Sequence, residues 1–160
     1  MHLSKKSLGI VAAISLAWLI VLVGMVANTA AQDPRLARAG ALEHTVGAFD
    51  QQGLNLAAVS VADIYGEEWI AGAFACPRET PESVGAQLDI DPAELDMLGG
   101  REIPDDTNYL ILRSMDGEVA LDRIDRSAVD LCATPLGGYF NTYDMLPVAK
   151  TQDGGWMLIV

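Results

Sequence analysis

The sequence predicts an α+β fold, in which an N-terminal transmembrane helix precedes a small, mainly antiparallel-sheet domain with two or three helices and one disulfide. Three observations lead to this prediction. The 160 residues are enough for one ordinary domain. A long apolar stretch precedes every acidic residue. Beyond it, short apolar runs alternate with turns that contain Gly, Pro and Asp.

The charge of the chain is divided sharply along its length. The formal net charge is −12, from 10 Lys and Arg against 22 Asp and Glu. Residues 1–31 carry two Lys and no acid, whereas residues 32–160 carry the other eight basic residues and all 22 acids. Without a basic surface to neutralise phosphates, nucleic acid is excluded as a partner. A hydrophobic content of 51% also excludes a disordered acidic tail.

Residues 8–27 have the length and composition of a membrane span. The stretch LGIVAAISLAWLIVLVGMVA has Ser15 as its only polar side chain. As a helix it would be about 30 Å long, the thickness of a bilayer core. Lys5 and Lys6 precede it, so residues 1–7 are expected to be a short cytoplasmic tail. This signal anchor predicts a single-pass protein of the cell membrane, whose C-terminal domain is extracytoplasmic.

Cleavage of the same segment is the alternative. Thr29, Ala30 and Ala31 form a usable signal-peptidase site before Gln32. Cleavage after Ala31 would release a secreted acidic protein, suited to a cationic ligand or partner. The apolar segment is longer than the usual core of a signal peptide, which favours the uncleaved anchor.

Small residues within the span predict a helical partner. Ala13 and Ala17 are four residues apart, a spacing that lets two helices approach closely. Trp18 lies in mid-span, although membrane Trp residues prefer the interface. A second helix packed on Trp18 would explain both features, and the alternative is that Trp18 faces lipid. The expected partners are therefore membrane proteins and the lipid bilayer.

The two cysteines predict one structural disulfide. Cys76 and Cys132 are the only Cys residues, and both follow the export signal. A redox-active pair would usually be close in sequence, and a zinc site would need further ligands.

The first part of the exported chain is expected to form a linker and then a hairpin. Residues 28–53 are expected to form a juxtamembrane linker with a helix near 34–51. Residues 54–160 are expected to form the extracytoplasmic domain. Residues 54–65 and 68–75 are apolar runs around Gly66, which favours a hairpin.

Helix-start signals and a second set of apolar runs follow. Pro81 and Pro92, after Thr80 and Asp91, predict short helices over about 80–88 and 91–98. The next segments are a central strand, its return strand and a C-terminal hairpin in which Pro147 favours an edge or bulged position. Their expected ranges are 108–113, 118–124, 145–150 and 156–160.

An aromatic loop lies between these strands. Tyr139, Phe140 and Tyr143 follow a Gly-Gly pair. They predict either an exposed loop that docks a partner or side chains that close over the core beside Cys132. Trp69 and Trp156 are expected in the core.

The sequence offers no catalytic set, no metal site and no cofactor motif. Residues 53–160 contain no His, and Lys150 is the only Lys after residue 31. Seven acids lie close together, but their spacing does not match a calcium loop and favours a solvated face. These are Asp89, Asp91, Glu94, Asp96, Glu102, Asp105 and Asp106.

Together these features predict a non-enzymatic, membrane-anchored interaction domain or accessory subunit of a membrane protein assembly. The secreted binding protein is the alternative. A carboxylate-based hydrolase is a remote alternative, because a pair of acids can act without His. No residue pattern identifies a small-molecule ligand.

Overall fold

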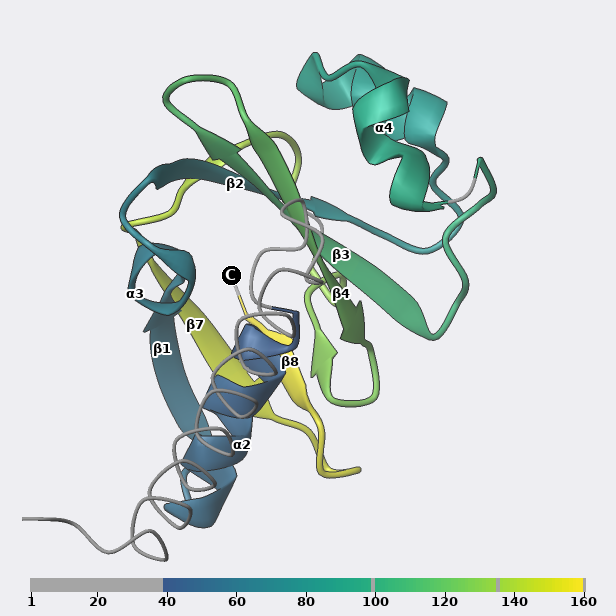
Figure 1. Ribbon diagram of the computed structural model, residues 1–160. Coiled ribbons are helices and arrows are strands. Elements are labelled where there is room, and N and C mark those ends of the chain that lie inside the picture. The colour runs from purple at the N-terminus through teal and green to yellow at the C-terminus, as the bar shows by residue number, and fades with distance from the viewer. Residues whose placement is uncertain (1–38, 99, 135, 160) are drawn as a thin grey trace, which may run out of the picture. The chain divides into compact units, whose positions relative to one another are not determined.

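Figure 1 shows the computed structural model of the chain, which describes residues 39–98, 100–134 and 136–159. The described residues form two four-stranded sheets, with strand orders β1-β7-β8-β5 and β4-β3-β2-β6. Every strand pair is antiparallel except β5 with β8. The elements are α2 (Ala41–Gln51), β1 (Leu56–Ser60), α3 (Val61–Tyr65), β2 (Trp69–Ala75), α4 (Pro81–Leu88), the 3₁₀ segment η1 (Pro92–Leu98), β3 (Thr107–Ser114), β4 (Val119–Asp125), β5 (Val129–Asp130), β6 (Phe140–Asn141), β7 (Met145–Lys150) and β8 (Trp156–Leu158).

This arrangement confirms the predicted α+β class and the disulfide. Two hydrophobic cores hold the layers together. The first lies between the sheets and includes residues of α2 and α3, such as Val46 and Tyr65. The second lies on the opposite face of β2 and β3, where α4 and η1 cover the sheet with Leu88 and Leu95 (Figure 1).

Strand β3 is central, as its nearly continuous apolar sequence predicted. It pairs with β2 on one side and β4 on the other. Its side chains alternate between the two cores, with Leu110 and Leu112 in the first and Tyr109 and Ile111 in the second. A strand buried on both faces needs apolar residues at every position, which explains the unbroken run.

The hairpin predicted from residues 54–65 and 68–75 is wrong. β1 pairs with β7, whereas β2 pairs with β3 and β6 in the other sheet. The chain changes sheets because Ser60 starts a helical turn, where its Oγ accepts a hydrogen bond from the Asp63 N–H at 3.3 Å. The Ala62 N–H then bonds to Thr142 O at 2.9 Å, which fixes α3 against the β6–β7 connection.

Helix α2 begins later than the apolar stripe suggested, at Ala41 after Gly40. Gly40 has a φ of 75°, a left-handed conformation that suits glycine. Leu42 and Val46 of α2 are buried in the first core. The helix therefore belongs to the same compact unit as the strands.

The two Pro-initiated helices form where predicted, but the second is not an α-helix. In α4, Thr80 and Ser83 make reciprocal side-chain hydrogen bonds to each other's backbone N–H, which is the capping-box arrangement. In η1, the Asp91 carboxylate accepts a hydrogen bond from the Ala93 N–H, so this cap is also confirmed. The segment is 3₁₀ and is interrupted at Leu95, whose side chain is fully buried.

The C-terminal hairpin is confirmed, and Trp156 and Leu158 point into the first core. The expected edge position of Pro147 is wrong, because β7 lies between β1 and β8. Pro147 is tolerated there because the β7–β8 ladder ends at this residue. The Ile159 N–H donates to Pro147 O at 3.0 Å, and proline has no N–H to return the bond.

Candidate functional site

The outer face of the β1-β7-β8 sheet is apolar, and no other element of the described residues covers it: Leu56, Ala58 and Met145 are exposed there, and Pro147, Ala149 and Met157 are half-buried. Strand register places Leu56 beside Ala149, Ala58 beside Pro147, and Ala149 beside Met157 on this face. Met145 also lies there, because it alternates along β7 with Pro147 and Ala149 and therefore shares their face. Leu56 is 64% exposed and Met145 is 59% exposed. We call these six residues the apolar face: Leu56, Ala58, Met145, Pro147, Ala149 and Met157.

An apolar outer face is unusual for a sheet whose other face already forms a core. The neighbouring positions Val59, Leu146 and Val148 fill the first core. Antiparallel sheets with one solvated face normally alternate apolar with polar residues. Here both alternating sets are apolar in β1 and β7, except at the last residue of each strand, Ser60 and Lys150. Contiguous exposed apolar surface of this kind is typical of a protein interaction site.

A hollow lies at the far side of this face, beyond β8. It has a volume of about 390 Å³, and its lining includes Met157, Arg126 and Asp130. Arg126 Nη2 donates to Asp130 Oδ2 at 2.6 Å, and Nη1 donates to Asp105 O at 2.9 Å. The bond to Asp130 raises the pKa of the Arg126 guanidinium. The apolar face is therefore bordered by a fixed ion pair.

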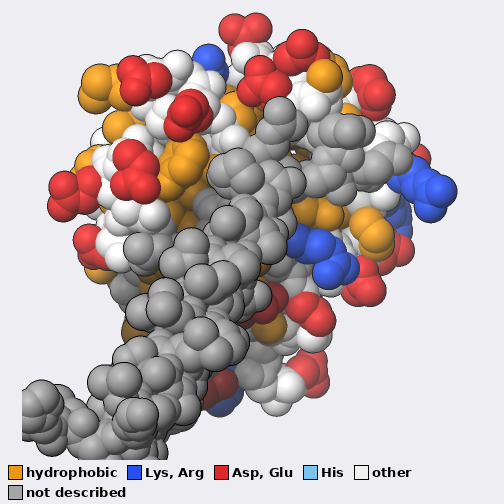
Figure 2. All heavy atoms as spheres, in the orientation of Figure 1, with side chains coloured by type: hydrophobic (Ala, Val, Ile, Leu, Met, Phe, Trp, Pro, Cys, Tyr) orange, Lys and Arg blue, Asp and Glu red, His pale blue; other side chains and the backbone are white. Residues whose placement is uncertain are grey.

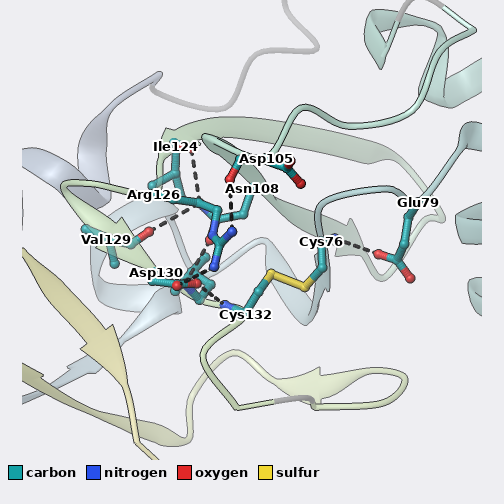
Figure 3. The surroundings of a disulfide bond; sticks show 10 residues. Cys76, Glu79, Asp105, Asn108, Ile124, Arg126, Val129, Asp130 and Cys132 are labelled. Carbon is teal, nitrogen blue, oxygen red and sulfur yellow. Dashed lines mark hydrogen bonds and ion pairs between the residues drawn. A yellow bond between two sulfur atoms is a disulfide. The ribbon is translucent and has the colours of Figure 1, made fainter.

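The disulfide holds the strand that carries this ion pair. Cys76 directly follows β2 and Cys132 follows β5, so the bond links the two sheets (Figure 3). Their Cα atoms are 5.8 Å apart. The Cys132 N–H donates to Asp130 Oδ1 at 2.9 Å, which orients the carboxylate toward Arg126.

Polar contacts at both ends attach α2 to the sheets. At its start, Asp122 of β4 is fully buried and accepts hydrogen bonds from the Tyr65 hydroxyl at 2.5 Å and the Gly40 N–H at 3.0 Å. At its end, Asp50 accepts from Lys150 Nζ at 2.6 Å and from Trp156 Nε1 at 3.2 Å. These contacts hold α2 beside the edge of β1.

Burial raises the pKa of Asp122, and the two hydrogen bonds that it accepts only partly offset this effect. Burial also raises the pKa of Tyr65, as does the neighbouring Asp122 carboxylate. Asp50 differs, because the hydrogen bond from Lys150 lowers its pKa.

The raised pKa of Asp122 predicts a pH-dependent stability. Between the unfolded value, about 3.8, and the higher folded value, the unfolded chain binds fewer protons than the folded chain. The contribution of Asp122 to the free energy of unfolding therefore falls as pH rises through that window. Urea unfolding from about pH 4 to about pH 7 should show that the wild-type protein loses stability relative to Asp122→Asn. A difference between the two proteins that does not change with pH would contradict the assignment.

The three aromatic residues of the predicted loop have different surroundings. Phe140 packs against the first core, with its ring centroid 5.0 Å from that of Phe74. Tyr139 is 37% exposed and Tyr143 is 51% exposed. Both hydroxyls donate to backbone oxygens, Tyr139 to Leu88 at 3.0 Å and Tyr143 to Glu67 at 2.8 Å. Phe140 thus packs on the core, whereas Tyr139 and Tyr143 are exposed, and docking of a partner by this loop stays a prediction.

The remaining sequence-based candidates are distributed as follows. Trp156 is buried and Trp69 packs beside the first core, as expected. Ala13, Ala17 and Trp18 lie outside the described residues. Within the described ranges, no helix is long and apolar enough to cross a membrane. The same ranges contain no group of three or more His, Cys, Asp or Glu side chains placed to hold a metal ion.

Comparison of the chain with protein-family models, with curated proteins and with solved structures finds no match.

Proposed function

We propose that this chain is a non-enzymatic, membrane-anchored protein whose domain lies outside the cytoplasm and binds another protein through the apolar face. It would act as an interaction domain or as an accessory subunit of a membrane protein assembly. The observation that carries the proposal is the uncovered outer face of β1 and β7, with Leu56 and Met145 more than half exposed. Apolar patches in a polar surround favour protein partners.

The location is inferred from two other features. Residues 8–27 have the length and hydropathy of a bilayer span. The Cys76–Cys132 disulfide favours an oxidising compartment. Cleavage after Ala31 is the second candidate, because small residues precede this position. An intact mass that corresponds to a chain beginning at Gln32 would establish it.

Two charge-introducing substitutions test the binding function. We expect Leu56→Lys and Met145→Lys each to abolish co-purification of the partner from detergent-solubilised membranes, because each would bury an unpaired ammonium in the interface. Both side chains are largely exposed, so the fold should lose less than about 0.5 kcal/mol.

The matched control is Met115→Lys. Met115 lies in the β3–β4 turn, away from the apolar face, and is 80% exposed. The same substitution there should leave co-purification unchanged. Equal recovery of the same companion protein with all four chains would contradict the proposed function.

A further inference from the structure

Strand β1 is the edge strand of its sheet. It pairs with β7 on one side, and no strand of the described residues lies on the other, since the sheet order begins with β1. The Lys150 N–H donates to Asn55 O at 2.9 Å, so Asn55 and Lys150 form a hydrogen-bonded pair. Bonded and non-bonded pairs alternate in an antiparallel ladder. The peptide groups of Leu56 and Ala58 therefore point away from β7.

The position of Pro147 agrees with this alternation. Pro147 lies opposite Ala58 and cannot donate a backbone hydrogen bond, so the pair is of the non-bonded kind. Among the described residues, no backbone hydrogen bond outside the β1–β7 ladder engages Leu56 or Ala58. Their N–H and C=O groups are free to pair with an added strand.

The sequence of β1 also lacks the residues that usually prevent such pairing. Residues 54–60, LNLAAVS, contain no charge and no proline. Natural edge strands are commonly protected by Lys, Pro or a bulge. Instead, a groove of about 170 Å³ runs beside the edge, between Thr45 and Phe49 of α2 and Ala58 of β1. Asp63 and Met145 also line this groove.

Charge indicates the kind of chain that fits this groove. Residues 39–77, which include α2, β1, α3 and β2, carry five carboxylates and neither Lys nor Arg. The nearby Lys150 is already paired with Asp50. Figure 2 shows how widely acidic side chains are spread over one face of the domain, with apolar side chains between them. A binding segment with basic flanks would meet complementary charge.

We propose that β1 accepts an extended segment of a partner protein as an added strand, and that this segment has alternating apolar residues flanked by Lys or Arg. The proposal rests on the proposed function and specifies its mode. Backbone hydrogen bonds to Leu56 and Ala58 supply affinity, and the acidic surround selects the basic flanks. A second copy of this chain would bring another acidic segment and no basic flanks. An anionic lipid surface would be repelled and would leave the free peptide groups unpaired.

The test uses the full chain in detergent and three synthetic peptides. The first alternates Val and Thr between pairs of Lys, the second has Glu in place of the flanking Lys, and the third is the first with every second amide N-methylated. We expect the first peptide to bind and to slow hydrogen exchange at the Leu56 and Ala58 amides. The other two should bind at least about tenfold more weakly, through lost charge complementarity and lost backbone bonds respectively.

A pair of substitutions at one position provides the matched control. Ala58→Pro removes an outward-facing N–H that the β1–β7 ladder does not use, and should weaken the first peptide about tenfold or more. Ala58→Val changes the same side chain but keeps the N–H, so it should bind the first peptide at least about tenfold more tightly than Ala58→Pro does. If Ala58→Pro fails to fold, the N-methylated peptide gives the same information on the unmodified protein.

Four results would overturn the inference. Equal binding of the N-methylated peptide would exclude strand addition, and equal binding of the Glu-flanked peptide would exclude a basic partner. A dimer of the wild-type chain that Ala58→Pro abolishes would assign the edge to a second copy. Loss of the native partner in Leu56→Lys but not in Ala58→Pro would overturn strand addition alone and leave the proposed function intact.

Discussion

Removal of the disulfide, by Cys76→Ala and Cys132→Ala together, is expected to lower the free energy of unfolding by roughly 4 kcal/mol. The bond joins residues 56 apart and connects the end of β2 to the segment after β5. Without the disulfide, the unfolded chain regains the conformational entropy of an open loop. The two sheets also lose the cross-link between their side chains. For a domain of this size the midpoint of thermal unfolding should fall on the order of 15 °C.

Thermal and urea unfolding of the full chain measure this effect directly. A reductant should destabilise the wild-type protein to a similar extent and should not affect the double variant further. If the two proteins unfold at the same temperature, the disulfide is not a main source of stability.

The second large effect is expected at Asn108 of β3, which is fully buried. Its Nδ2 donates to Ile124 O at 3.0 Å and to Val129 O at 3.2 Å, and its Oδ1 accepts from the Leu131 N–H at 2.8 Å (Figure 3). One side chain thus joins β3 to β4 and to the segment around β5. Asn108→Asp keeps the size but places a carboxylate oxygen against two carbonyl oxygens. We expect a loss of at least about 3 kcal/mol.

An exposed asparagine provides the control. Asn141 Oδ1 accepts a hydrogen bond from the Tyr143 N–H, which an aspartate can also accept. Asn141→Asp should therefore change stability by less than about 0.5 kcal/mol. Urea unfolding of both variants at neutral pH separates the two positions, and equal stability would refute the role of Asn108.

Local signals predicted the elements whose structure is decided locally. The Thr80-Pro81 start of α4 predicted a helix, and the apolar sequence of β3 predicted its central position. The C-terminal hairpin also followed from its own turn residues. These features depend on capping, on burial and on short-range pairing, all of which are visible in a few adjacent residues.

Long-range pairing was not predictable in the same way. The register of β1 with β7 joins Leu56 to Ala149, far apart in the sequence. In the sequence, Ser60 could equally continue the strand. Only the structure shows that its side chain caps a helical turn by accepting a hydrogen bond from the Asp63 N–H. β5 and β6 have two residues each, too few to give a periodic signal.

The candidate site was missed for a related reason. Exposed apolar residues in β1 and β7 resemble core residues until the register shows which face is covered. The buried Asp122 and Asn108 likewise resemble surface residues, because only their partners on distant segments explain their burial. The one available signal was that both alternating sets are apolar in residues 56–59 and 145–149.

Site-specific photocrosslinking in intact cells tests the central claim most directly. A photoreactive amino acid would replace Leu56, Met145 or Met157 in turn, with Met115 as the exposed control position. If the apolar face binds a protein, the three face positions should give the same crosslinked species, and position 115 should not. Adducts of equal yield from all four positions, or from position 115 alone, would contradict the account.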